Sequence, residues 1–173
     1  MSLEAQGQPG WYLLVFKPEY DTVAFDPLDP VKRYHEGLFV ETDPVSQDGT
    51  LFHVTGDIIA AGGMMYEERT DSIPGASKYL FRNPQIGRVL KTDFHSGRII
   101  TILRDLPTPS KQQGINCWEP NPNTGHHDIT WTKQNGDFYK SGEEQRPIFK
   151  CNEWTHQLAI PALRNAGVLC HLA

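Results

Sequence analysis

Apolar residues recur at helical spacing near the C-terminal end of the chain. The apolar positions of this segment are Trp154, Leu158, Ala159, Ala162, Leu163 and Ala166. Their wide arc is typical of a buried amphipathic helix that packs on a sheet, with Trp154 in the core. The helix is expected to run from about residue 152 to Gly167, because glycine tolerates the positive φ that ends many helices. Pro161 is expected to kink this helix or to loosen one of its turns.

The middle of the chain instead carries short runs of branched and aromatic residues, which indicate β-strands. The expected strands cover residues 11–16, 34–42, 50–57, 64–68, 79–82, 86–92 and 98–103. The first is apolar enough to be buried on both faces, and the alternative for the last is a short helix. Turn residues at 43–49 predict that the second and third strands are antiparallel neighbours. The pattern predicts an α+β fold, in which an antiparallel sheet or small barrel packs against the C-terminal helix.

Two polar segments interrupt this pattern. Residues 20–33 have the Asp and Pro content of turns and surface loop. Residues 107–146 are rich in Pro, Asn, Gly and Gln, and forty such residues are too many for an idle loop in a compact domain. We expect this segment, called the flap below, to be a functional element or a partly mobile insertion.

Composition narrows the class of protein. A chain of 173 residues with 38% hydrophobic residues fits one globular domain over residues 1–173. The net charge of −5, without a basic cluster longer than Lys32-Arg33, argues against a nucleic-acid surface. No apolar run approaches a membrane span, and residues 1–10 lack the apolar core of a signal peptide, so we expect a cytoplasmic protein. Three widely spaced cysteines suggest neither a disulfide framework nor a zinc site.

Cys151 is the first candidate for chemistry, since it lies where the C-terminal helix begins. Free N–H groups and the positive end of the helix dipole favour an anion there, and Lys150 adds a positive charge, so the thiol is expected to tend toward thiolate. The alternative is a small buried hydrophobic residue. Cys117 has similar neighbours, but Pro120 and Pro122 follow it and argue against a helix, which makes it the weaker nucleophile candidate.

Two histidines complete the inventory of a thiol enzyme. His35 leads one expected strand and His53 lies in the next, so pairing of the two strands can bring both imidazoles together. In thiol catalysis an imidazole takes the thiol proton and a third polar group fixes its orientation and tautomer. The alternative for each histidine is a half-buried structural group.

These segments resemble a known family. Tyr-His-Glu-Gly-Leu-Phe-Val at 34–40, followed by Leu-Phe-His-Val at 51–54, resembles the histidine segment of the lecithin retinol acyltransferase-like proteins. Lys-Cys-Asn-Glu-Trp at 150–154 is similar to their Asn-Cys-Glu-His-Phe motif, with Lys150 in place of the asparagine and Glu36 in place of the usual Trp after the first histidine. That family belongs to the circularly permuted branch of the papain-like, NlpC-type superfamily. The chain also resembles a group of small fungal proteins of uncertain function with a C-terminal Cys-x-x-Trp helix.

The resemblance implies a fold and a reaction. The fold would be a small antiparallel sheet with the cysteine-bearing helix packed against it. Cys151 would be the nucleophile, His35 the base and His53 the orienting group. The reaction would be acyl transfer, or amide or ester hydrolysis, on a small molecule or lipid through a thioester, with no metal and no cofactor.

Other side chains complete the list of candidates. Trp118 and Trp131 in the flap are candidates to line a pocket for an apolar ligand, together with Asn152 beside the cysteine. His126 and His127 are adjacent in a loop and rarely converge on one ion without distant ligands, so no metal site is expected there. Asp57 is expected to form a turn.

Two other functions remain open at this point. The protein could be a biosynthetic cyclase or isomerase, whose pocket guides a reactive substrate without a covalent step while histidines polarise a carbonyl. It could also be a non-enzymatic binding module with the flap as its recognition loop. The sequence leaves the substrate and the oligomeric state undetermined.

Overall fold

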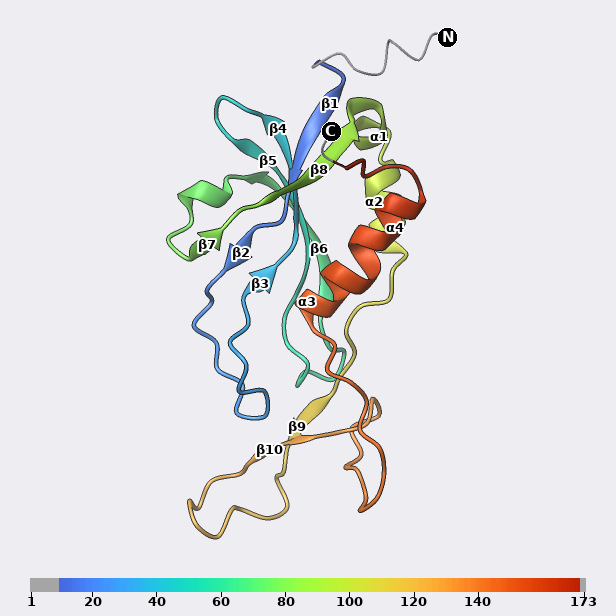
Figure 1. Cartoon of the computed structure of the whole chain (residues 1–173). Coiled ribbons are helices and arrows are strands. Elements are labelled where there is room, and N and C mark those ends of the chain that lie inside the picture. Colours follow the sequence, from blue (N-terminus) through green and yellow to red (C-terminus); the bar gives the residue numbers. More distant parts are fainter. Residues whose placement is uncertain (1–9, 172–173) are drawn as a thin grey trace.

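The computed structural model describes residues 10–171 and is built around one antiparallel sheet (Figure 1). The sheet has five strands in the order β6-β5-β4-β1-β8. Its strands are β1 (Tyr12–Phe16), β4 (Leu38–Asp43), β5 (Asp48–Thr55), β6 (Met65–Ser72) and β8 (Gln85–Leu90). The predicted hairpin is confirmed, since β4 and β5 are antiparallel with Leu38 opposite Phe52.

A smaller sheet of order β3-β2-β7 lies beside the large one. It consists of β2 (Glu19–Tyr20), β3 (His35–Glu36) and β7 (Leu80–Arg82), and the 3-10 helix η2 (Pro74–Ala76) precedes β7. The segment 34–42, expected as one strand, therefore divides between two sheets at Gly37. A Cβ atom at this glycine would lie 2.9 Å from the Phe52 carbonyl oxygen, which explains why β5 can approach so closely.

Residues 98–103 form a helix, the second of the two expected alternatives. Helices α1 (Lys91–His95) and α2 (Arg98–Arg104) follow β8. Ile99 and Leu103 lie one helical turn apart and are fully buried. Their four-residue spacing puts both on the same face of a helix, which explains why this segment is helical. Figure 1 shows α2 on the same side of the sheet as the C-terminal helix.

The C-terminal helix begins at Cys151 and packs against the sheet, which confirms the predicted α+β class. It consists of α3 (Cys151–Glu153), the π-helix η3 (Trp154–Ala159) and α4 (Ile160–Asn165). Trp154 is completely buried and its ring lies 6.0 Å from that of Tyr66 on β6. The helix is thus anchored on the sheet one turn after the cysteine.

The expected irregularity around Pro161 takes the form of the π-helix. The Ile160 N–H donates to the Thr155 carbonyl, five residues back instead of four. A wider turn before a proline fits its missing N–H and the bulk of its ring. The helix ends as predicted, because Gly167 has φ +69° and the Val168 N–H returns to the Leu163 carbonyl at 2.9 Å.

β1 is not buried on both faces as expected. Leu13 and Val15 are buried in the main core, whereas Leu14 between them is 38% exposed. The alternation arises because an antiparallel sheet with helices on one face needs apolar side chains mainly on that face. A run of apolar residues therefore does not by itself distinguish a half-exposed strand from a buried one.

The flap contains a small hairpin and has a fixed base. Strands β9 (Gln113–Ile115) and β10 (Ile129–Trp131) are antiparallel, and in Figure 1 they extend away from the large sheet. The buried Gln112 side chain is hydrogen-bonded in both directions to the Phe149 backbone, at 2.6 and 2.9 Å. The flap base is thereby joined to the segment that enters the cysteine helix. Over residues 10–171, no helix has the length and apolar character needed to cross a membrane.

Candidate active site

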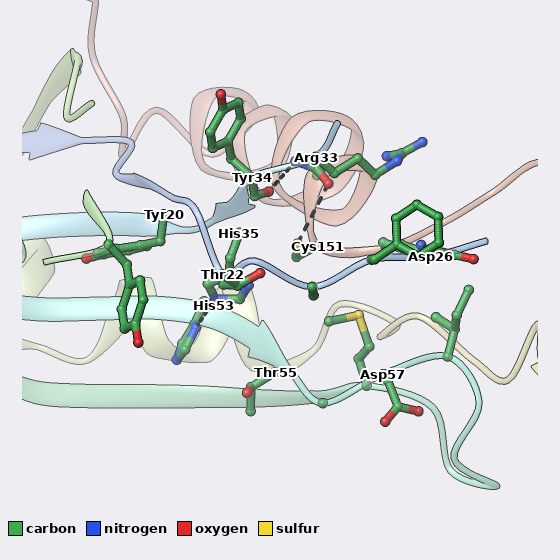
Figure 2. A pocket seen from close by; sticks show the side chains of 18 of the residues that line it. Tyr20, Thr22, Asp26, Arg33, Tyr34, His35, His53, Thr55, Asp57 and Cys151 are labelled. Atoms are coloured by element: carbon green, nitrogen blue, oxygen red, sulfur yellow. Dashed lines mark hydrogen bonds and ion pairs between the residues drawn. The ribbon is translucent and has the colours of Figure 1, made fainter. Parts of the chain in front are cut away.

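A cavity of about 900 Å³ lies between the loop 21–34 and strands β5 and β6, and the start of the C-terminal helix closes one side of it. His35, His53, Cys151 and Asn152 all line this site cavity. Figure 2 shows the two imidazoles facing each other beneath the helix that carries Cys151. The fold therefore brings together the three side chains expected to carry the chemistry.

The two imidazoles form a directly hydrogen-bonded pair. His35 on β3 and His53 on β5 have their Nε2 and Nδ1 atoms 2.7 Å apart, with the rings edge to face at 74°. Burial lowers the pKa of His35 to about 4, and the neighbouring His53 and Arg69 act in the same direction. Burial also lowers the pKa of His53. Both imidazoles are thus neutral at pH 7 and available as proton acceptors.

A carboxylate that sequence reasoning missed lies on the far side of His53. Glu67 is directly opposite His53 in the register of β5 and β6, and its Oε2 lies 3.0 Å from His53 Nε2. The distance suits a hydrogen bond, although the imidazole N–H is not aimed along it and Nε2 lacks a well-aligned acceptor. At this distance the carboxylate attracts a proton on Nε2 even without a straight hydrogen bond. Only the strand register could have revealed Glu67, since Glu67 and Glu68 are equivalent in sequence.

The Cys151 thiol lies beside the histidine strand and is 8% exposed. It makes a long hydrogen bond of 3.8 Å to Asn152 Oδ1, while the Asn152 Nδ2 donates to the Tyr34 carbonyl at 2.9 Å. Asn152 thus connects the thiol to the residue that precedes His35. The start of the helix and the histidine strand are positioned together.

The expected thiolate is wrong for the ligand-free protein. Burial raises the pKa of the Cys151 thiol, and backbone N–H groups near the sulfur offset only part of this effect. Lys150 does not lower the pKa as expected, because its ammonium is 2.5 Å from Asp26 and 3.8 Å from Asp29. The thiol is therefore protonated at pH 7 and needs a base to become a nucleophile.

No hydrogen bond joins this thiol to His35 or His53 within residues 10–171. The thiol and the imidazole pair line the same cavity from adjacent elements, α3 and β3. Catalytic hydrogen bonds are often long in ligand-free enzymes and shorten when substrate binds. The arrangement places the thiol and the imidazole pair along one cavity.

Loop 21–34 forms a wall of the cavity, although residues 20–33 were expected only as turns and surface loop. Two ion pairs hold it to the start of the helix, Arg33 with Glu153 at 2.6 Å and Asp26 with Lys150. Within the loop, Arg33 also pairs with Asp29. The Arg33–Glu153 pair joins residues that are 120 positions apart in the sequence, and the Lys150–Asp26 pair joins residues 124 positions apart. The side chains that close this wall compensate one another's charge.

Trp118, Trp131 and Cys117 lie away from the cavity, whereas Asp57 lines it. Trp118 is 86% exposed and Trp131 packs partly buried against the core, and neither lines the cavity. Cys117 is exposed in the flap. Asp57 forms the expected turn by accepting the Ile59 and Ala60 N–H groups at 2.9 and 2.7 Å.

The adjacent histidines of the flap show no converging ligands. The Nδ1 of His127 lies 2.6 Å from the Asn116 carbonyl oxygen. Over residues 10–171, no group of three or more His, Cys, Asp or Glu side chains is arranged to hold a metal ion. The flap instead contributes Gln113 and Ile129 to the cavity wall, which the sequence did not suggest.

Comparison with known proteins gives one match. The family described as "Family of unknown function (DUF6540)" matches residues 23–170, which include every residue of the imidazole pair and the cysteine helix. No curated protein and no solved structure matches the chain.

Proposed function

The chain belongs to the DUF6540 family, and we propose that it is a cysteine-dependent enzyme that transfers or hydrolyses an acyl group. Its substrate is an amide or ester of a small molecule or lipid. The observation that carries the proposal is the neutral His35–His53 pair, joined at 2.7 Å in the same cavity as Cys151. A thiol that is protonated at rest needs a neutral base to take its proton, and burial keeps this imidazole pair neutral at pH 7.

The reaction begins with proton transfer. The Cys151 thiol gives its proton to His35 as the sulfur attacks the carbonyl carbon of the substrate. The C–O or C–N bond then breaks, His35 returns the proton to the leaving group, and a thioester remains on the sulfur. Water or an acceptor alcohol or amine, deprotonated by His35, attacks the thioester and regenerates the thiol.

The start of the helix suits the charge that develops on the carbonyl oxygen. The N–H groups of its first turn have no acceptor within the helix. Directed at the cavity, such groups stabilise an oxyanion, which is often the largest single contribution to acyl-transfer catalysis. His53 holds the second nitrogen of His35 and keeps the ring oriented between turnovers.

The likeness to permuted papain-like proteins supports the same assignment. In this chain, as in the lecithin retinol acyltransferase-like proteins, the histidines precede the cysteine and the cysteine opens a helix on an antiparallel sheet. The proposal includes a reducing, cytoplasmic location, because a nucleophilic thiol is lost when it is oxidised.

The test is acylation of a single-cysteine protein. In a Cys117→Ala, Cys170→Ala background only Cys151 can form a thioester. Incubation with p-nitrophenyl acetate at pH 7 is expected to add one acetyl group to Cys151, detected by mass spectrometry, with release of p-nitrophenolate. Cys151→Ala should abolish the release, and His35→Gln should slow it by about 10²-fold or more. Wild-type release from Cys151→Ala would refute the covalent mechanism.

The raised pKa of Cys151 also favours a second candidate, a cyclase or isomerase that uses the cavity without a covalent bond. Neutral histidines could then polarise a substrate carbonyl while the walls fix its conformation. Under this mechanism Cys151→Ser retains turnover of the natural substrate, whereas His35→Ala loses it.

A further inference from the structure

We propose that Glu67 is a positioning residue of this site, which acts through His53 to keep His35 in the tautomer that can accept the thiol proton. This inference rests on the proposed function, since it assigns the base one particular nitrogen, Nδ1 of His35. It adds a carboxylate to the cysteine and two histidines.

Two neutral arrangements of the imidazole pair satisfy the 2.7 Å hydrogen bond. In the first, His35 Nε2–H donates to His53 Nδ1, and His35 Nδ1 keeps a free lone pair. In the second, His53 Nδ1–H donates to His35 Nε2, and His35 carries its remaining proton on Nδ1. Only the first leaves a nitrogen of His35 that can take a proton from a thiol.

Glu67 selects the first arrangement. An ionised carboxylate only accepts hydrogen bonds, so Oε2 at 3.0 Å favours the proton on His53 Nε2 and leaves His53 Nδ1 as an acceptor. His53 is 2% exposed, so water competes little for this nitrogen. The proton on His35 must then sit on Nε2.

Arg69 holds the carboxylate in this role. Its Nη2 lies 3.2 Å from Glu67 Oε2, two residues further along the same face of β6. The guanidinium donates to the carboxylate and so holds it in place beside His53. The sequence of contacts therefore runs from Arg69 through Glu67 and His53 to His35, with each group fixing the proton on the next.

The neighbouring residue offers a matched control. Glu68 lies on the same strand but pairs with Arg104 of α2 at 2.9 Å. Glu68→Gln and Glu67→Gln remove the same charge from adjacent positions. Glu67→Lys is the sharper variant, because an ammonium can only donate and thus favours the second tautomer.

The experiment reads the tautomers directly by long-range ¹H–¹⁵N NMR of the histidine rings at pH 7, in the single-cysteine background described above. The wild type and Glu68→Gln are expected to carry the proton of both His35 and His53 on Nε2. Glu67→Gln should give a mixture and Glu67→Lys should move the His53 proton to Nδ1. Acetylation of Cys151 by p-nitrophenyl acetate should fall about tenfold or more in Glu67→Gln and further in Glu67→Lys. The upper bound is the about 10⁴-fold loss seen when serine proteases lose the carboxylate that fixes their histidine tautomer.

The outcomes separate this inference from the proposed function. Unchanged tautomers in both Glu67 variants would overturn the role of Glu67, even if Cys151 still forms a thioester. Changed tautomers with wild-type acetylation would overturn it as well, since the tautomer would then not matter to the base. Failure of Cys151 to be acetylated in the otherwise unaltered single-cysteine protein would instead overturn the proposed function, whatever the NMR spectra show.

Discussion

The buried imidazole of His35 makes the stability of the protein depend on pH. In the unfolded chain this imidazole has its ordinary pKa of 6.5, whereas burial lowers the pKa in the folded protein to about 4. Between these values the unfolded chain binds a proton that the folded protein does not bind. The free energy of unfolding is therefore expected to fall as the pH decreases from 6.5 to about 4, and the contribution of His35 should level off below that.

The magnitude follows from the two pKa values. At ~1.4 kcal/mol for each pH unit, the His35 contribution to this loss is about 3 kcal/mol. This is a large part of the about 5–15 kcal/mol that stabilises a typical domain. His53 acts in the same direction, because burial lowers its pKa too.

The assay is urea unfolding followed by tryptophan fluorescence at several pH values from 7 to 4. His35→Gln removes the titrating group, so its loss of stability over this range should be about 3 kcal/mol smaller than that of the wild type. Carboxylates that titrate in the same range contribute in both proteins and cancel from the comparison. His126→Gln, which removes an exposed imidazole of the flap, serves as the control and should behave like the wild type. Equal losses in wild type and His35→Gln would refute the burial argument.

Three substitutions test how the site is held. Trp154→Ala removes a completely buried ring and should lower the free energy of unfolding by about 3–5 kcal/mol in the same urea assay, and a loss below 1 kcal/mol would contradict its anchoring role. Gly37→Ala places a Cβ atom 2.9 Å from the Phe52 carbonyl and the His53 Cβ, so about 1–3 kcal/mol of stability should be lost and the His35–His53 NMR signals should shift. Asn152→Ala breaks the connection to the Tyr34 carbonyl and should slow acetylation of Cys151 by about 10–100-fold, whereas Asn165→Ala at the other end of the helix should not. Equal rates in these two variants would show that Asn152 does not position the thiol.

The sequence revealed those parts of the site that depend on local pattern. The helix that begins at Cys151 follows from four-residue apolar spacing, and the β4–β5 hairpin follows from turn residues between two apolar runs. The pairing of these two strands, with His35 just before the first, explains why the two histidines meet. None of these inferences needed knowledge of distant contacts.

Other parts depend on register and long-range charge pairing, which no local pattern contains. Glu67 could be assigned only after β5 and β6 were aligned so that it stood opposite His53. Lys150 was expected to favour the thiolate of the cysteine next to it, but Asp26, 124 residues away in the sequence, lies beside its ammonium. The thiol pKa is raised instead of lowered for a related reason, because the effect of burial depends on what the whole fold packs around the sulfur.

The connections between the loop 21–34 and the cysteine helix span 118 to 124 residues of chain. Contacts of such high sequence separation cost the most loop-closure entropy and tend to form late in folding. The β4–β5 hairpin that carries His53 can form from residues close in sequence. The Cys151 sulfur takes its place in the cavity only when the contacts between the loop 21–34 and the C-terminal helix form. The protein would therefore acquire its reactive centre in the final step of folding, after the compact sheet is already in place to shield it.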